Sequence, residues 1–559
     1  MLAKVFSAVN IGLDSRLVEV EVDVSHGFPS FEIVGLPDTA VKEAKERVHS
    51  AIANSGLKFL PGNKKRLVVN LAPADVKKEG SIYDLPIAVG ILIASEEISA
   101  DFLTPSVSPG TGGSPHSGTV PMGRIKEGVG KSLFVGELAL DGALRHTKGI
   151  LPMVLLAKKL EIKNIFLPET NAREAALVEG LKIYPLKSLK QFLNWTRGQE
   201  EIRPFESKGL ENIPRRDYEF DFGYIKGQEY VKRALEIVAA GAHNALMIGP
   251  PGAGKTLLAR ALPSILPEMT GEEVLEVTKI ASVAGLLREN EFLRCERPFR
   301  APHHTISDIA MVGGGQVPRP GEVSLAHRGV LFLDELPEFS RRVLESLRQP
   351  LEDGLILVSR ARGRASYPAK FIFIASMNPC PCGFWGDPER ECRCTPGEIV
   401  RYRRKISGPF LDRIDLHLEV PRVKFEKLTS EKVAEASNKI RSRVERARLR
   451  QRERFSRPKS GSQPEADQPL AGASGGKNLK ILTNSEMPPR QIEKFCQIDE
   501  PGQDLLKKAV EKFALSARSY HRILKVARTI ADLAGQEKIS SSHLAEAIQY
   551  RTKLNETLF

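Results

Sequence analysis

The feature of this 559-residue chain that most restricts its fold is an apolar run that ends in a glycine-rich turn. The segment at 244–262 reads NALMIGPPGAGKTLLARAL. The pattern predicts a buried strand, a loop and a helix in direct succession. In that order, glycines let successive backbone N–H groups converge on one point, and the start of the helix adds partial positive charge. The sequence therefore predicts a loop that binds phosphate.

The predicted loop has the composition of an ATP site. We expect the nucleotide to contact Gly249, Pro250, Pro251, Gly252, Ala253, Gly254, Lys255, Thr256 and Leu257. Lys255 is expected to contact the β- and γ-phosphates, and Thr256 to hold Mg²⁺. A ligand-free glycine turn before a helix is the alternative, but the complete motif in its strand–loop–helix context disfavours it.

Two further apolar strands are predicted to bring catalytic groups to the same edge of the sheet. GVLFLDELPEF (329–339) delivers Asp334, expected to hold Mg²⁺ through water, and Glu335, expected to orient and polarise the attacking water. AKFIFIASMNP (369–379) delivers Asn378, which is placed to position the γ-phosphate or that water. An ordinary turn at a strand end is the alternative for Asn378, and the company of the other motifs favours the catalytic interpretation.

The chain is too long for a single core, so we expect several domains. We predict an α+β domain at 1–195 with a mobile loop at about 105–123, a linker at 196–220, an α/β core at 221–440, a basic helix and disordered linker at 441–478, and a helical C-terminal domain at 479–559. The boundaries follow tracts rich in glycine, serine and proline.

The net charge of +13 and the sequence pI of about 9.3 favour a polyanionic partner such as nucleic acid. The segment 439–459 carries ten Lys or Arg against two Glu. An unevenly charged soluble surface is the alternative. The N-terminus lacks a signal-peptide pattern, and no apolar run reaches membrane-spanning length, so we expect a cytoplasmic protein with no membrane partner.

Four of the six cysteines lie in one insert at 380–394. They are Cys380, Cys382, Cys392 and Cys394. Two such pairs can bind tetrahedral Zn²⁺, and four thiolates would leave no position for water, so the zinc would be structural. The Cys-x-Cys spacing is tighter than in most zinc sites, and a reduced cysteine-rich loop is the alternative.

Several motifs together resemble one family. They are GPPGAGKT, RPFRAPHHTIS, PRPGEVSLAHRGVLFLDELPEF, SMNPCPCG, ISGPFLDRIDLHLEVP and SARSYHRILKVARTIADL. They are similar to the YifB/ComM family of bacterial AAA+ ATPases, related to the magnesium-chelatase motor subunit and to MCM helicases. The resemblance implies an AAA+ P-loop core with a helical C-terminal lid. It also implies a homo-hexameric ring that hydrolyses Mg·ATP to drive DNA branch migration in recombination or natural transformation.

The same resemblance implies roles for two arginines. Arg413 resembles an arginine finger, which reaches the γ-phosphate bound by the neighbouring subunit; a salt bridge to Asp412 or Asp415 is the alternative. Arg518 resembles the sensor arginine of the helical lid, which touches nucleotide in its own subunit. Arg522, one helical turn later, is the rival for that role.

The segment 351–375 is strand-like on both sides of RARGR, which predicts a hairpin with Arg360, Arg362 and Arg364 near its tip. In related helicases a hairpin at this place projects into the central pore. Arginines there would suit a sequence-independent grip on DNA phosphates. A solvated basic turn is the alternative.

The N-terminal domain resembles the Lon protease domain, which needs a Ser nucleophile activated by a Lys. Asp84 stands where that family carries its serine and Pro152 where it carries its lysine; Ser81 and Lys148 are the nearest candidates. The resemblance therefore implies a non-proteolytic scaffold. Three alternatives to a DNA motor remain: a chelatase-type motor that remodels a protein or metal-insertion partner, a Lon-type ATP-dependent protease, and a non-enzymatic scaffold.

Overall fold

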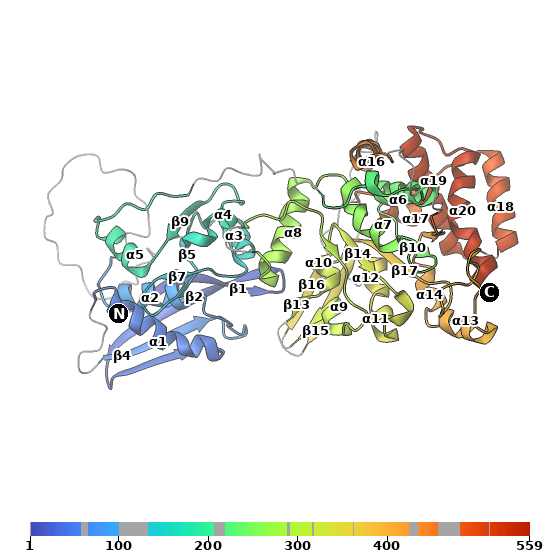
Figure 1. The fold of residues 1–559 in the computed structure, drawn as a ribbon. Helices are drawn as coiled ribbons and strands as arrows, with labels where there is room; N and C mark the ends of the chain where they lie inside the picture. The colour runs from blue at the N-terminus through green and yellow to red at the C-terminus, as the bar shows by residue number, and fades with distance from the viewer. Residues whose placement is uncertain are drawn as a thin grey trace.

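The computed structural model describes residues 2–57, 65–99, 132–205, 218–287, 291–315, 318–360, 363–423, 434–456, 481–513 and 515–558, without the side chains of 359–364 and 552–558. Figure 1 shows the N-terminal α+β part at one end, a sheet core in the middle and the C-terminal helices at the other end. The loop predicted at 105–123, residues 206–217 of the predicted linker at 196–220 and residues 457–478 of the segment 441–478 lie outside the described residues.

In the described N-terminal part, one sheet has the strand order β3-β4-β2-β1-β5-β8-β9. Its strands are β1 (Leu2–Ile11), β2 (Asp14–His26), β3 (Ser30–Val34), β4 (Lys65–Ala72), β5 (Ser132–Phe134), β8 (Asn164–Pro168) and β9 (Lys182–Leu186), and its helices are α1 (Thr39–Asn54), α2 (Asp84–Ala94), α3 (Ile150–Lys159), α4 (Ala172–Ala175) and α5 (Leu189–Thr196). A short hairpin joins β6 (Glu137–Leu138) to β7 (Leu144–Arg145). The valines at positions 18, 20 and 22 are fully buried, as their alternation with acidic residues predicts.

The central core is a parallel sheet with the order β11-β14-β17-β10-β18. Its strands are β10 (Ala245–Ile248), β11 (Phe299–Arg300), β14 (Val330–Leu333), β17 (Ile372–Met377) and β18 (Leu416–Glu419), flanked by α6 (Glu229–Gly241), α7 (Lys255–Ala261) and α8 (Gly271–Ala284). All residues of β14 and β17 are buried, as in sheets covered on both faces. Because every neighbouring pair is parallel, all carboxyl ends meet at one edge. The α/β class with a parallel sheet is thus confirmed.

Smaller elements decorate this core. They are α9 (Asp308–Val312), β12 (Gly313–Gly314), β13 (Arg319–Pro320), α10 (Glu322–Leu325), α11 (Arg341–Ser346), α12 (Arg348–Asp353), β15 (Leu355–Arg360), β16 (Gly363–Pro368), α13 (Pro396–Arg403) and α14 (Gly408–Leu411). Strands β15 and β16 form the antiparallel hairpin that the sequence predicts.

Helices make up the described C-terminal part: α16 (Ser437–Ser456), α17 (Pro489–Phe495), α18 (Glu500–Phe513), α19 (Ala517–Ala534) and α20 (Ser541–Leu558). Helix α16 spans the boundary predicted at residue 440 and packs against α6 and α19. Its arginines are partly used inside the chain: Arg443 pairs with Glu236, Arg448 donates to the Ala239 carbonyl at 2.9 Å, and Arg454 pairs with Asp532. Charge counted along the sequence therefore overstates the basic surface of this helix.

The N-terminal part docks onto the core through α3 and α8 (Figure 1). The Ser282 hydroxyl donates to a Glu174 carboxylate oxygen at 2.5 Å, and the Gly149 N–H donates to the Ser282 carbonyl at 3.1 Å. Leu13, in the turn between β1 and β2, joins the apolar cluster that includes Tyr367 of β16. No described helix is both long and apolar enough to cross a membrane.

Candidate nucleotide site

The glycine-rich loop leads from β10 into α7, as the sequence predicts. Gly252 and Gly254 have positive φ values of 77° and 87°, a conformation that favours glycine and lets the loop turn into the helix. The Lys255 ammonium donates to the carbonyls of Gly249 at 2.7 Å and Pro250 at 2.9 Å. It also donates to the Asn378 side-chain oxygen at 3.1 Å, and burial lowers its pKa. The loop lysine and the polar end of β17 therefore meet.

Thr256 and Asp334, the two expected Mg²⁺ holders, are in direct contact. The Thr256 hydroxyl donates to a carboxylate oxygen of Asp334 at 2.8 Å. The Ser376 hydroxyl of β17 donates to the other oxygen, which also accepts from the Glu335 N–H at 3.1 Å. Hydroxyl and carboxylate oxygens are the ligands that Mg²⁺ prefers, so this pair suits the ion. The sequence analysis missed Ser376, whose only signal is a hydroxyl inside an apolar strand.

Glu335 follows in a left-handed conformation with φ of 54°, and its side chain faces solvent. His304 Nδ1 lies 3.8 Å from a Glu335 carboxylate oxygen. The sequence analysis did not foresee this contact with the expected catalytic base. A cavity of about 440 Å³ beside Glu335 and Asn378 is also lined by Arg401 and Lys405. These two cations were likewise missed; the basic run RYRRK is the signal that carried them.

The expected arginine finger lies at the opposite edge of the sheet. Arg413 precedes β18, whereas the loop follows β10, and the two strands are parallel. Its guanidinium donates to the Pro409 carbonyl at 2.6 Å and pairs with Glu352 of α12. The alternative partners Asp412 and Asp415 are thus replaced by a carboxylate about 60 residues upstream.

Arg518 lies with Arg413, not with Lys255: its guanidinium is 3.3 Å from a Glu352 carboxylate oxygen. This contact is at the amino edge of the sheet, and the role of Arg518 as a sensor of nucleotide in its own subunit stays a prediction. Its rival Arg522 pairs with Asp415 at the same edge. All three arginines therefore face away from the chain's own loop.

The four cysteines of the insert are gathered around one point, and their sulfurs all lie within 4.8 Å of one another. Cys380, Cys382 and Cys392 have sulfur separations of 3.3, 3.7 and 3.6 Å. Tetrahedral Zn²⁺ with Zn–S bonds of about 2.3 Å requires sulfurs about 3.8 Å apart, so the residues fit this metal. Burial raises the pKa of the Cys382 thiol, but N–H donors from Phe384 and Arg393 bring it down to about 6.

The arginine hairpin is described by its backbone. In the β15–β16 register Arg360 stands opposite Gly363, and Arg364 opposite Ser359. Arg362 lies outside the described residues, as do the side chains of Arg360 and Arg364. The hairpin is present, and its contact with a ligand stays a prediction.

Asp84 is buried and forms an ion pair with Arg47. It begins α2, and the Arg47 guanidinium donates to its carboxylate at 2.7 Å. Burial raises the pKa of Asp84 to about 6 against the opposing effect of Arg47. The Ser81 hydroxyl donates to Glu137, and the Lys148 side chain packs against Gly285 of the core. These contacts leave Ser81 and Lys148 engaged with other residues; Pro152 is a buried residue of α3.

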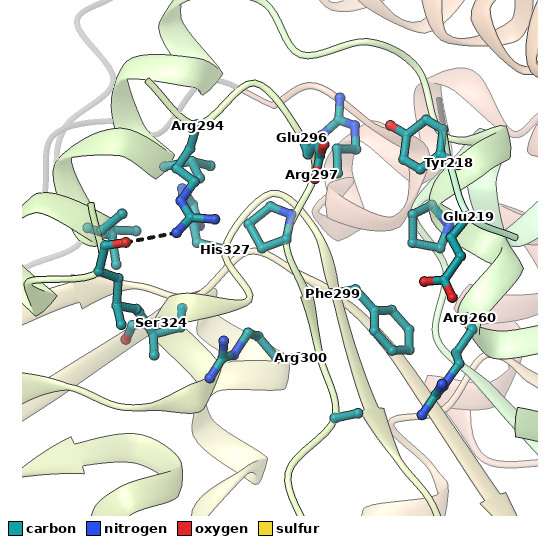
Figure 2. A pocket seen from close by; sticks show the side chains of 18 of the residues that line it. Tyr218, Glu219, Arg260, Arg294, Glu296, Arg297, Phe299, Arg300, Ser324 and His327 are labelled. Atoms are coloured by element: carbon teal, nitrogen blue, oxygen red, sulfur yellow. Dashed lines mark hydrogen bonds between the residues drawn. The ribbon is translucent and has the colours of Figure 1, made fainter. Parts of the chain in front are cut away.

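A second cavity, of about 520 Å³, lies between α8 and β11 and is lined by several arginines (Figure 2). Arg297 pairs with Glu273 at 3.1 Å, and Arg300 pairs with Glu322 at 2.6 Å. Arg294 donates to the Leu286 carbonyl at 2.8 Å, the dashed line in Figure 2. These arginines are held by groups of the chain itself, so the cavity does not have the character of an anion site.

Family models cover most of the chain. Residues 221–428 match magnesium chelatase, subunit ChlI, and residues 434–551 match the C-terminal region of that subunit. Residues 20–107 and 122–171 match a further model described as subunit ChlI of Mg-chelatase.

Individual relatives agree with these matches. The chain is 42% identical to competence protein ComM of Haemophilus influenzae over 98% of this chain and 97% of that protein. It is 39% identical to YifB of Escherichia coli over the same shares of the two chains. The magnesium-chelatase 38 kDa subunit of Rhodobacter capsulatus is 29% identical over 29% of this chain and 50% of that subunit.

Proposed function

The chain belongs to the family of magnesium-chelatase-like AAA+ proteins that includes ComM and YifB, and from this premise we propose that it is a Mg·ATP-driven ring motor that moves on DNA. One observation carries the proposal. Lys255, Thr256, Asp334 and Asn378 converge at one edge of the parallel sheet, while Arg413 lies at the opposite edge. An ATP site that needs Arg413 is complete only when a second subunit supplies it, as in a closed hexamer.

In this proposal each residue has one task. The backbone of the loop and Lys255 neutralise the phosphates, and Thr256 and Asp334 hold Mg²⁺. Glu335 orients and polarises the attacking water, and Asn378 fixes the γ-phosphate beside Lys255. Arg413 of the adjoining subunit stabilises the charge that develops in the transition state. Because Arg518 lies beside Arg413, we assign it to the same neighbouring phosphate site.

DNA as the substrate is supported by three features. The relative with the highest identity given above is a competence protein. The chain carries a net charge of +13, and arginines stand at positions 360, 362 and 364 where β15 and β16 form a hairpin. We propose that Arg360, Arg362 and Arg364 contact DNA phosphates in the pore and that the motor drives branch migration. The likeness to a magnesium-chelatase subunit favours one alternative, a motor that remodels a protein partner.

The remaining parts have supporting roles. We propose that the C-terminal helices act as the lid of the nucleotide site and that the four-cysteine insert holds a structural Zn²⁺. We propose that the N-terminal sheet is a Lon-like scaffold without protease activity, since Asp84 is committed to Arg47.

The test is the ATPase rate of the full chain with and without forked or Holliday-junction DNA, with strand displacement measured in the same samples. We expect junction DNA to stimulate hydrolysis, and we expect branch migration to separate the junction into its component duplexes without strand cleavage. The Glu335→Gln variant should bind ATP and DNA but displace nothing, which controls for passive melting. ATP hydrolysis without any response to DNA would favour the protein-remodelling alternative, and no hydrolysis would overturn the proposal.

A further inference from the structure

A cavity of about 870 Å³ opens beside the first residues of the phosphate loop. Its lining comes from Gly249 and Pro250 of the loop, from residues 228–231 at the start of α6, from 419–423 after β18, and from 385–389 of the cysteine insert. The volume is within the range of small-molecule sites. No feature of the proposed hydrolysis mechanism uses this cavity.

The strand order says which end of a nucleotide would reach it. Along the carboxyl edge the sequence of groups is Asp334 after β14, Asn378 after β17, the loop after β10, and then β18. The terminal phosphate belongs at the end marked by Asp334 and Asn378. The other end of the nucleotide therefore extends toward β18, where the cavity lies.

The lining suits a planar, largely apolar group. Tyr230 and Trp385 each keep 36% of their surface exposed, and Met377 and Val420 add apolar walls. Aromatic rings stack on nucleobases of any sequence. The Gln228 amide donates to the Ala253 carbonyl of the loop at 3.4 Å and so ties the floor of the cavity to the phosphate site.

The cysteine insert holds one wall in place. The backbone N–H of Trp385 donates to the Cys380 sulfur at 3.3 Å. The Arg403 guanidinium lies 4.2 Å from the centre of the Trp385 ring. Asp387 pairs with Arg422 at 2.9 Å. Gly383, with φ of 85°, approaches Pro251 so closely that an added Cβ would lie 2.7 Å from the proline ring. The four sulfurs, the cavity wall and the phosphate loop are therefore in one continuous contact.

We propose that this cavity binds the base of the nucleotide and that a metal held by the four cysteines sets nucleotide affinity by fixing the wall at Trp385. The inference rests on the proposed function, because it takes the loop at Lys255 as the ATP site. A loop that carries a thiolate cluster folds when the cluster binds Zn²⁺ and unfolds when the metal is removed. Loss of the metal thus frees Trp385 and loosens the contact between Gly383 and Pro251.

The first experiment measures ADP affinity of the full chain before and after zinc removal with a chelator. Trp195 and Trp385 are the two tryptophans of the chain, so the Trp195→Phe background makes Trp385 the reporter. We expect about one zinc per chain, quenching of Trp385 by ADP, and a Kd that rises roughly tenfold on zinc removal and recovers when Zn²⁺ is returned. Since this comparison needs no change in the insert, it does not depend on whether a cysteine variant folds.

The second experiment separates base from phosphate. Trp385→Ala should weaken ADP binding roughly tenfold while changing pyrophosphate binding less than about twofold, because pyrophosphate lacks a base. The double variant Cys392→Ser, Cys394→Ser should match the zinc-free protein and fail to recover with Zn²⁺. Cys295→Ser, outside the insert, is the matched control and should behave as the unchanged chain.

The outcomes are distinct. Unchanged ADP affinity after zinc removal, or a zinc content near zero, overturns the metal coupling, and equal losses of ADP and pyrophosphate in Trp385→Ala overturn the base site. Both results are compatible with normal ATPase activity and leave the proposed function intact. A chain that binds no ADP in its zinc-loaded form instead overturns the proposed function.

Discussion

The two edges of the central parallel sheet use polar residues in opposite ways. At the carboxyl edge Thr256 and Glu335 are exposed, whereas Lys255 is buried and donates to two loop carbonyls and to Asn378. At the amino edge Asp415 keeps 5% of its surface exposed and is held by Arg522, His243 and a backbone N–H. The carboxyl edge therefore leaves the hydroxyl of Thr256 and the carboxylate of Glu335 open to a ligand, whereas the buried charges of the other edge join the core to α19.

Arg413 is a buried charge at the amino edge that we also propose to meet the ATP of a neighbouring subunit. Its replacement is therefore expected to have the largest effect. In Arg413→Ala we expect ATPase activity to fall about 10³-fold or more, because the finger stabilises the transition state in the adjoining subunit. Mixing this variant with Lys255→Ala subunits, which keep their own finger, should restore part of the activity. The exposed Arg404→Ala is the matched control and should hydrolyse ATP normally. Full activity in Arg413→Ala would refute the finger assignment.

Lys255→Ala tests the carboxyl edge. Its ATPase activity should fall about 10³-fold, since the loop loses the charge that faces the phosphates. Its thermal unfolding midpoint should hold or rise, because burial lowers the pKa of Lys255 and removing the ammonium relieves that desolvation cost. Calorimetry and a phosphate-release assay on one preparation measure both quantities. A large loss of stability would show that this edge is structural after all.

Asp415→Asn tests the amino edge. The free energy of unfolding should fall by about 3–5 kcal/mol, because a buried arginine loses its counter-charge. Urea unfolding followed by circular dichroism measures the change. Asp412→Asn, three residues earlier and 42% exposed in its side chain, should cost less than about 1 kcal/mol. Equal effects of the two substitutions would contradict the contrast between the edges.

The pH dependence of stability gives the smallest effect. Burial alone would raise the pKa of Asp415, but Arg522 and His243 hold it well below its usual range. The stabilisation from this depressed pKa is complete above the unfolded-state value near 4 and is lost as the pH falls below it. Between pH 4 and 3 we expect the unchanged chain to lose about 1 kcal/mol more than Asp415→Asn. Parallel acid-unfolding curves for the two proteins would exclude this role.

The sequence predicted the carboxyl edge far better than the amino edge. Apolar runs identify β10, β14 and β17, and parallel strands must bring Lys255, Asp334 and Asn378 together. The amino edge depends on contacts between distant segments. Sequence proximity suggested Asp412 or Asp415 as the partner of Arg413, but the placement of α12 supplies Glu352.

Two other misses have the same physical origin. A count of charges along α16 cannot tell which arginines face α6 and α19, and it therefore overestimates the free cationic surface. Motif spacing likewise carries no information about Arg403 stacking on Trp385, because that contact depends on how α13 returns over the insert.

The turn between β1 and β2 has a consequence for how the molecule can be dissected. An added Cβ on Gly12 would lie 2.8 Å from the Ala365 side chain, and Leu13 is buried beside Tyr367 at the base of the arginine hairpin. Cutting the chain after the N-terminal sheet would expose these apolar side chains of β16 to water. A shortened core would then expose an apolar surface at the base of the hairpin proposed to bind DNA. Aggregation through this surface would be mistaken for loss of motor activity.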